Sequence, residues 1–160
     1  MRALALTALA SALVVLAACS PPAEAPAAPE PAPEPAPVLA GVDLTQPLRA
    51  VGNEPFWAVE LTGSELVYSG VDRPEQRAPQ GEPVLQGTMA VWEATTTAGT
   101  PLSVTLTATE CSDGMTSRTY PLTALVRVGE EMLTGCAATV SAIMSTGESG
   151  RVVDKAQPAG

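Results

Sequence analysis

Apolar side chains recur at every second position through much of residues 42–140, and no long helical pattern follows residue 40. The clearest run is 102–109, where leucine, valine and alanine alternate with serine and threonine. Shorter alternating runs occur at 57–61, 66–68, 84–95 and 120–128. A period of two places alternate side chains on opposite faces of a strand, so one face is buried. Six to eight short strands joined by tight turns predict an all-β domain, a small antiparallel barrel or sandwich.

The N-terminal segment 1–18 has a different pattern, that of a secretory signal peptide. Arg2 is its only charged residue, and the apolar run from Ala3 to Ala18 follows directly. Sixteen helical residues span about 24 Å at 1.5 Å per residue, which is shorter than the ~30 Å hydrocarbon core of a bilayer. A cleaved signal is therefore favoured over a permanent transmembrane helix.

The apolar run ends in Leu16-Ala17-Ala18-Cys19, which resembles the lipobox of bacterial lipoproteins. The resemblance implies that Cys19 is diacylated and becomes the new N-terminus, so the protein is anchored to a membrane by lipid. Ser20 stands where Gram-negative lipoproteins retained in the inner membrane carry Asp, which implies an outer-membrane, periplasm-facing location. The alternative is a secreted protein with an unmodified cysteine.

Residues 19–41 are expected to form a tether between this anchor and the β-domain. Eight of the sixteen prolines lie between residues 20 and 37, mixed with alanine and glutamate. Such a segment cannot bury enough apolar surface to fold, and it favours an extended polyproline II conformation. After residue 18 the chain carries 7 Lys and Arg against 17 Asp and Glu. This acidity is atypical of nucleic-acid binding and favours a cationic partner, or simply gives solubility.

Two further segments have weaker patterns. Residues 74–83 are polar and rich in proline, which predicts an exposed loop. Residues 141–160 are rich in serine and glycine, with apolar residues at 143–144 and 152–153. We expect this last stretch to be either a frayed tail or one more edge strand.

Three cysteines are present, and lipidation of Cys19 leaves Cys111 and Cys136. Outside the cytoplasm these two are expected to form a structural disulfide. The chain-entropy model gives about 3.5 kcal/mol for a closed loop of roughly 26 residues. A redox-active pair is disfavoured because no Cys-x-x-Cys occurs, and a metal site is disfavoured because the chain has no histidine.

Three motifs are prominent in the β-rich region. They are Glu-Pro-Phe-Trp at 54–57, Cys-Ser-Asp-Gly-Met-x-x-Arg-x-Tyr-Pro at 111–121 and Leu-x-Gly-Cys at 133–136. Together they resemble a family of bacterial envelope lipoproteins that carry this signature. The resemblance spans residues 52–137 and implies a small β-rich domain with a Cys111–Cys136 bridge. The resemblance also implies that such domains occur beside modules similar to lysozyme inhibitors or heat-inducible lipoproteins. It implies no catalytic residue.

The motif residues give the candidate binding set: Glu54, Trp57, Asp113, Arg118 and Tyr120. Ser-Asp-Gly at 112–114 predicts a turn in which Asp113 accepts from its own backbone and glycine takes a positive φ.

Arg118 has two interpretations: it folds back onto Asp113 or Glu110 to pin a hairpin, or it grips a carboxylate or phosphate of a ligand. In the second case Tyr120 offers a hydroxyl and an aromatic face. Phe56 and Trp57 are adjacent, so they point to opposite faces of a strand. Trp57 is then either a core residue or part of a ligand groove.

The function classes follow from what the sequence contains. Without histidine or a recognisable nucleophile motif, catalysis is not expected, and no cofactor or metal is expected. The favoured interpretation is a non-catalytic, lipid-anchored envelope protein whose β-domain binds an envelope component. The alternatives are a periplasmic inhibitor of a cationic hydrolase such as lysozyme, and a carrier of a small ligand inside the barrel.

Overall fold

The computed structural model describes residues 35–154. The expected signal peptide at 1–18, the lipidated Cys19 and most of the linker lie outside these residues. Within the described part, no helix is long and apolar enough to cross a membrane.

The domain is built on one antiparallel sheet of nine strands, in the order β6-β5-β4-β3-β12-β11-β9-β8-β7. The strands of this sheet are β3 (Leu48–Asn53), β4 (Phe56–Leu61), β5 (Glu65–Gly70), β6 (Arg73–Pro79), β7 (Val84–Gln86), β8 (Met89–Thr95), β9 (Pro101–Thr107), β11 (Leu122–Val128) and β12 (Glu131–Thr139). Two small two-stranded sheets accompany it: β1 (Val38–Leu39) with β2 (Val42–Asp43), and β10 (Ser117–Thr119) with β13 (Ser149–Arg151), the latter pair parallel. The all-β prediction is confirmed.

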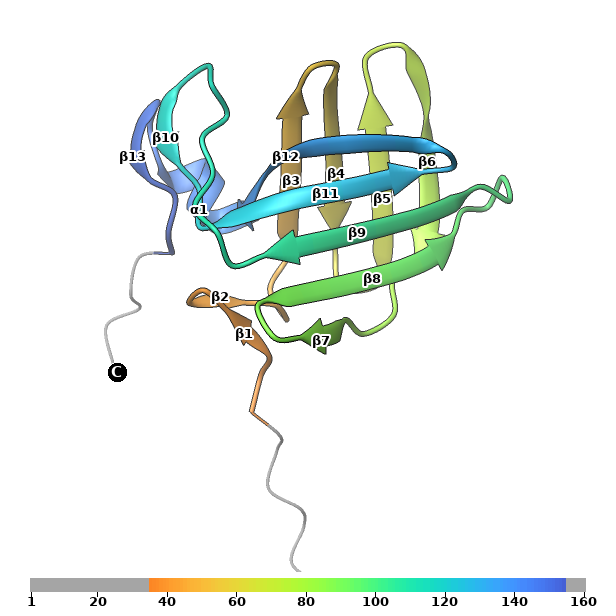
Figure 1. Ribbon diagram of the computed structural model, residues 1–160, viewed down its shortest axis with the longest axis horizontal. Helices are drawn as coiled ribbons and strands as arrows, with labels where there is room; N and C mark the ends of the chain where they lie inside the picture. The colour runs from red at the N-terminus through yellow and green to blue at the C-terminus, as the bar shows by residue number, and fades with distance from the viewer. Residues whose placement is uncertain (1–34, 155–160) are drawn as a thin grey trace, which may run out of the picture. The chain divides into compact units, whose positions relative to one another are not determined.

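The large sheet curls into a half-barrel, so that β3–β6 form one wall and β8, β9, β11 and β12 cross in front of it (Figure 1). The interior is filled by large side chains from both walls. Trp92, Tyr68, Leu61, Leu66 and Leu106 are all at most 2% exposed. Burial of this apolar surface is the main force that holds the two walls together.

The alternating pattern positions this core as predicted. In β9 the residues Leu102, Val104 and Leu106 are buried, and the serine and threonines between them are half-buried. β11 shows the same alternation and pairs with β9 in register, Ala124 opposite Leu106. Because the side-chain period is two, this register keeps the alternating buried residues of both strands on the inner face, and Leu125, at 38% exposed, is the large apolar residue of β11 that faces outward.

The expectation of an exposed loop at 74–83 is wrong for most of its length, because residues 73–79 form the edge strand β6. The prolines at 74 and 79 are compatible with this position, since an edge strand leaves N–H sites unpaired. Ala78 is its only residue that reaches the core. With one buried position in seven, its sequence shows no alternation of apolar and polar residues. β6 is one of the nine strands of the sheet.

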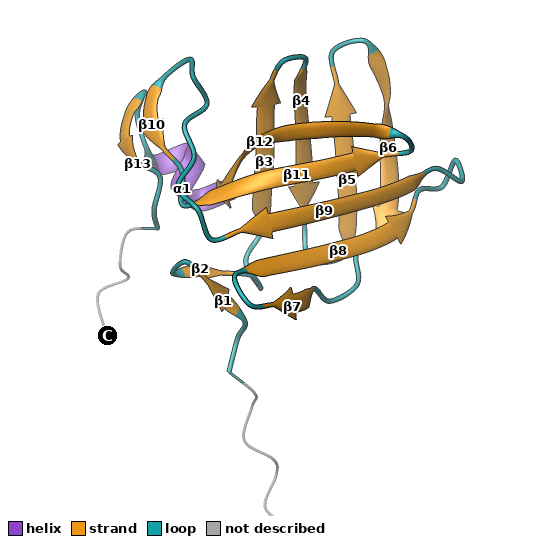
Figure 2. Cartoon of the chain, viewed as in Figure 1, coloured by secondary structure: helices purple, strands orange, loops and turns teal. Residues whose placement is uncertain are grey.

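The folded region also extends beyond the expected limits of 42 and 140. Leu39 and Val42 are buried in the β1–β2 hairpin at the base of the half-barrel (Figure 2). At the other end the chain forms the short helix α1 (Val140–Ser145), capped by Thr139, and then β13. Of the two expectations for 141–160, an edge strand is found at β13, Ser149–Arg151, and residues 155–160 lie outside the described part. Ile143 and Met144 are helical.

This C-terminal segment covers a second apolar cluster on the outer face of β12. Cys136, Ala138, Tyr120, Ala142 and Val152 form it. Thr139 Oγ1 accepts from the Ala142 N–H at 3.1 Å and donates to the Asp154 carboxylate at 2.8 Å. The C-terminal segment is therefore fixed to β12 at both of its ends.

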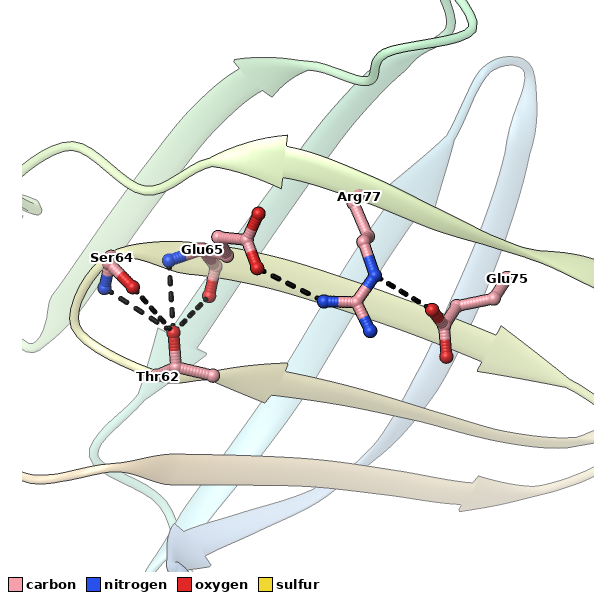
Figure 3. A network of polar contacts seen from close by, with 5 residues as sticks. All are labelled: Thr62, Ser64, Glu65, Glu75 and Arg77. Atoms are coloured by element: carbon pink, nitrogen blue, oxygen red, sulfur yellow. Dashed lines mark hydrogen bonds and ion pairs between the residues drawn. The ribbon is translucent and has the colours of Figure 1, made fainter.

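At the C-terminal end of β4, a polar network stabilises the turn to β5 (Figure 3). The Thr62 hydroxyl accepts from the Glu65 N–H at 2.9 Å, and Arg77 of β6 binds Glu65 at 3.0 Å and Glu75 at 2.8 Å. The hydrogen bond that Arg77 donates to Glu75, followed by the charge of Glu75, raises the pKa of Arg77 above its ordinary value. This arginine therefore stays charged and offsets part of the charge of the two glutamates.

Candidate functional site

Residues from all three sequence motifs line one groove on the outer face of the sheet, with a volume of about 790 Å³. Its residues come from the end of β3 and the turn to β4, from the loop that follows β9, from the start of β11 and from the middle of β12. They are Val51, Gly52, Asn53, Glu54, Phe56, Cys111, Ser112, Asp113, Gly114, Met115, Thr123, Thr134, Gly135 and Cys136. Segments some 80 residues apart in sequence thus form a single surface feature.

The β3–β4 turn presents Phe56 to solvent and buries Trp57. Phe56 is 52% exposed, and Trp57 is 4% exposed and packs with Val59 and Leu61 in the core. The prediction that these two aromatics face opposite ways is confirmed. The structure favours the core interpretation of Trp57, and the aromatic side chain of the groove is Phe56.

Two glycines on inward-facing positions make room for the Trp57 indole. An added Cβ at Gly52 would collide with the indole Nε1 and would lie 2.8 Å from the Thr134 carbonyl. An added Cβ at Gly135 would collide with the Val51 carbonyl and lie 2.9 Å from Trp57 Cζ2. Close approach of this kind is a reason for glycine inside a strand. Trp57 thereby supports the groove from beneath.

The loop of residues 111–116 is organised by the Asp113 carboxylate. This group accepts from the Met115 N–H at 3.0 Å, from the Thr116 N–H at 2.8 Å and from the Thr116 hydroxyl. Gly114 has φ +71°, so the predicted turn is confirmed. Asn53 Nδ2 donates to the Asp113 carbonyl and joins this loop to the β3–β4 turn.

The same hydrogen bonds control the charge of Asp113. Partial burial opposes ionisation, but the donors of Thr116, Met115 and Tyr120 together outweigh it and lower the pKa of Asp113 below its ordinary value. The carboxylate is therefore negative throughout the neutral and mildly acidic range.

The disulfide between Cys111 and Cys136 joins the loop to β12, with 5.4 Å between the Cα atoms. The predicted pairing of these two cysteines is confirmed. Cys136 is 1% exposed and belongs to the second cluster, whereas Cys111 lies at the surface of the groove. The bridge therefore closes one side of the groove covalently.

Tyr120 and Arg118 lie outside the groove lining, and of the two only Tyr120 contacts a lining residue. Tyr120 is 2% exposed, and its hydroxyl donates to Asp113 Oδ2 over 3.4 Å. Arg118 donates to the carbonyls of Gly147, at 2.7 Å, and Thr146, at 2.9 Å. The expectation that Arg118 folds back onto Asp113 or Glu110 is wrong, because the carbonyls at the end of α1 are the acceptors in reach. Glu110 pairs with Arg151 at 2.6 Å.

Glu54 is the remaining candidate, and it lies in the groove at the exposed β3–β4 turn. Among residues 35–154, its carboxylate has neither a hydrogen bond nor an ion pair. Glu60 and Glu131, in contrast, each pair with an arginine: Glu60 with Arg49 at 3.4 Å, and Glu131 with Arg73. Within the described chain, three or more His, Cys, Asp or Glu side chains nowhere gather as a metal site would require.

Of the five candidates, the groove brings together Glu54 and Asp113; Trp57 lies beneath it, Tyr120 bonds the Asp113 carboxylate, and Arg118 binds the chain after α1 instead. Asn53, Phe56 and Met115 also line the groove, although they are not among the five candidates. For Phe56 the signal was present, because Trp57 shares its strand face with Val59 and Leu61. For Met115, which is 65% exposed, no local pattern distinguishes a rim residue from any loop residue.

Comparisons with protein-family models, with curated proteins and with solved structures gave no match.

Proposed function

We propose that this protein is a lipid-anchored lipoprotein of the bacterial envelope whose β-domain binds another envelope component in the groove described above. It acts by binding and not by catalysis. Cys19 carries the lipid, the proline-rich segment spans the distance to the domain, and the domain faces the periplasm from the outer membrane. The lipobox and the apolar segment before it support the anchor.

The observation that carries the binding proposal is the meeting of the three motifs on one exposed groove. Motif residues that serve packing end in the core, as Trp57 and Tyr120 do. Phe56 and Met115 instead stay exposed in motif positions, on loops fixed by a disulfide and by Asp113. Rigid loops that present apolar side chains bind with a smaller loss of conformational entropy.

Photo-crosslinking in the envelope tests the groove. The full chain is produced with benzoylphenylalanine at Phe56, and the matched control carries it at Val84, which is 59% exposed. Val84 lies on β7, at the far edge of the sheet. We expect a discrete adduct from position 56 and none from position 84. Identical adduct patterns, or none from either position, would contradict a binding role for the groove.

The anchor has its own test. Mass spectrometry of the mature protein is expected to show an N-terminal Cys19 with diacylglyceryl and acyl groups. A Cys19→Ser variant is expected to leave the membrane fraction, because a triacylated anchor buries many CH₂ groups at about 0.8 kcal/mol each. An uncleaved, unmodified N-terminus would refute the anchor.

A second candidate is inhibition of a cationic hydrolase such as lysozyme. The described domain pairs Arg49, Arg73, Arg77 and Arg151 with its own glutamates, so its surplus acids face solvent without compensation. Long-range attraction to a basic enzyme follows. We expect a lysozyme assay at micromolar protein to show inhibition that weakens at high salt, and unchanged lysis would remove this candidate. A small-ligand carrier is less well supported, because large side chains fill the interior.

A further inference from the structure

We propose that the groove binds a cationic protein segment, with an arginine or lysine side chain at Glu54 and an apolar neighbour against Phe56 and Met115. This inference rests on the proposed function, because it names the ligand class for the same groove. It goes beyond a general preference for positive charge, since it assigns the recognition to one carboxylate and one aromatic side chain.

The first argument is the charge of the lining. Glu54 and Asp113 are its two ionisable residues, and no lysine or arginine is among the described residues that line it. Arg118, the nearest cation in the motif, is occupied by the carbonyls of Thr146 and Gly147. Asp113 is saturated by donors of its own loop, so Glu54 is the carboxylate that is open to a ligand.

The second argument is the apolar surface beside that carboxylate. Phe56 and Met115 are 52% and 65% exposed and come from the two loops joined by the Asn53–Asp113 bond. An exposed aromatic ring and a flexible thioether both offer apolar contact area. Both side chains therefore suit an apolar residue next to the arginine or lysine that pairs with Glu54.

The third argument is size. A volume of about 790 Å³ lies within the range of roughly 300–1,000 Å³ that holds drug-sized ligands, and it exceeds what a single ion needs. A second hollow of about 360 Å³ continues past Phe56 over β3, β4 and β5 and includes Val71, which is 69% exposed. Arg49 lines this second hollow, and its charge is offset by Glu60 at 3.4 Å. An elongated ligand can therefore place its cation at Glu54 and its apolar part across Phe56 and the second hollow.

Two peptides test this assignment with the full chain in a non-ionic detergent. One is acetyl-Leu-Arg-Leu-Arg-Leu-amide, and the other replaces both arginines with citrulline, which keeps the shape and removes the charge. Titration calorimetry is expected to give about fivefold tighter binding of the arginine peptide, which corresponds to about 1 kcal/mol for an exposed charge pair. Glu54→Gln is expected to abolish this preference.

Glu82→Gln is the matched control, because it removes the same charge in the hollow beside Gly63, at the other end of β4. It is expected to leave the preference for the arginine peptide intact. Phe56→Ser is expected to weaken both peptides by about fivefold, since a half-exposed aromatic side chain contributes apolar contact to each.

Equal affinities of the two peptides for the unaltered chain, or no binding of either, would overturn the cationic assignment. Equal effects of Glu54→Gln and Glu82→Gln would do the same. The proposed function fails separately, when crosslinking at position 56 gives no specific adduct. A specific adduct together with equal peptide affinities would therefore preserve the groove as a binding site and reject its cationic ligand.

Discussion

Gly135→Ala gives the sharpest test of the packing beneath the groove. Gly135 lies on the inner side of β12, with the Val51 carbonyl of β3 and the Trp57 indole against the place where a Cβ would be. The Val51 carbonyl cannot retreat without disturbing the pairing of Val51 with Cys136. Because overpacking of a well-packed core costs about 1–3 kcal/mol, we expect Gly135→Ala to lie at the upper end, about 3 kcal/mol.

Gly52→Ala provides the comparison that identifies the cause. Its added methyl group meets mainly the Trp57 side chain, which can be removed by Trp57→Leu. In the Trp57→Leu background, Gly52→Ala is expected to cost about 1–2 kcal/mol less than it does alone. In the same background, Gly135→Ala is expected to keep most of its loss of stability, because its added methyl group meets the backbone carbonyl of Val51.

Urea unfolding of the oxidised protein, followed by tryptophan fluorescence, measures these free energies, because Trp92 remains as a probe in the Trp57→Leu backgrounds. Gly81→Ala is the control, since nothing lies within 4 Å of a Cβ at Gly81. It is expected to change stability by less than about 0.5 kcal/mol. A Gly135→Ala cost as small as that of the control would refute the account of Trp57 held between two glycines.

Three further changes probe the loops around the groove. The double variant Cys111→Ala with Cys136→Ala is expected to lose about 3.5 kcal/mol in urea unfolding, because the bridge closes a loop with a sequence separation of 25; a loss below about 1 kcal/mol would contradict this. Asp113→Asn is expected to lower stability by about 1 kcal/mol at pH 7, through weaker hydrogen bonds to the loop. The pKa of Asp113 is lowered in the folded state, so its contribution is complete above the unfolded value of about 3.8 and disappears as pH falls through the folded value. The difference between Asp113→Asn and the unaltered protein should therefore shrink below about pH 4, and a constant difference from pH 7 to 2 would show that ionisation plays no part. Arg118→Ala is expected to speed hydrogen exchange at the Thr146 and Val152 amides by roughly tenfold, because it removes the bonds to the carbonyls after α1. Glu110→Gln is the milder control, because its ion pair with Arg151 is exposed. Unchanged exchange in both variants would mean that Arg118 does not hold the C-terminal segment.

The success of sequence reasoning differed between strands for a physical reason. β9 and β11 have one buried and one outer face, and their alternation is the direct record of that difference. β6 is an edge strand with one buried side chain, so its sequence resembles that of a loop. α1 is six residues long and buries only Ala142, which is too little for a helical period to be visible.

In the site, too, local features were predicted from the sequence and long-range contacts were not. The turn chemistry of Asp113 is local, and the pairing of Cys111 with Cys136 follows once no other cysteine remains for them. The acceptors of Arg118 lie 28 and 29 residues away, directly after a short helix that the sequence did not reveal. No local pattern could have identified them.

The sequence by itself determined the β-rich class, the burial of one face of each central strand, the cysteine pair and the conformation of the 112–114 turn. Each depends on neighbouring residues or on simple counting. Only the tertiary structure decided that Phe56, Glu54 and Met115 share one groove and that Trp57 lies beneath it. The curl of the sheet and the register of β3 against β12 bring those residues together, and both arise from contacts between residues far apart in the chain.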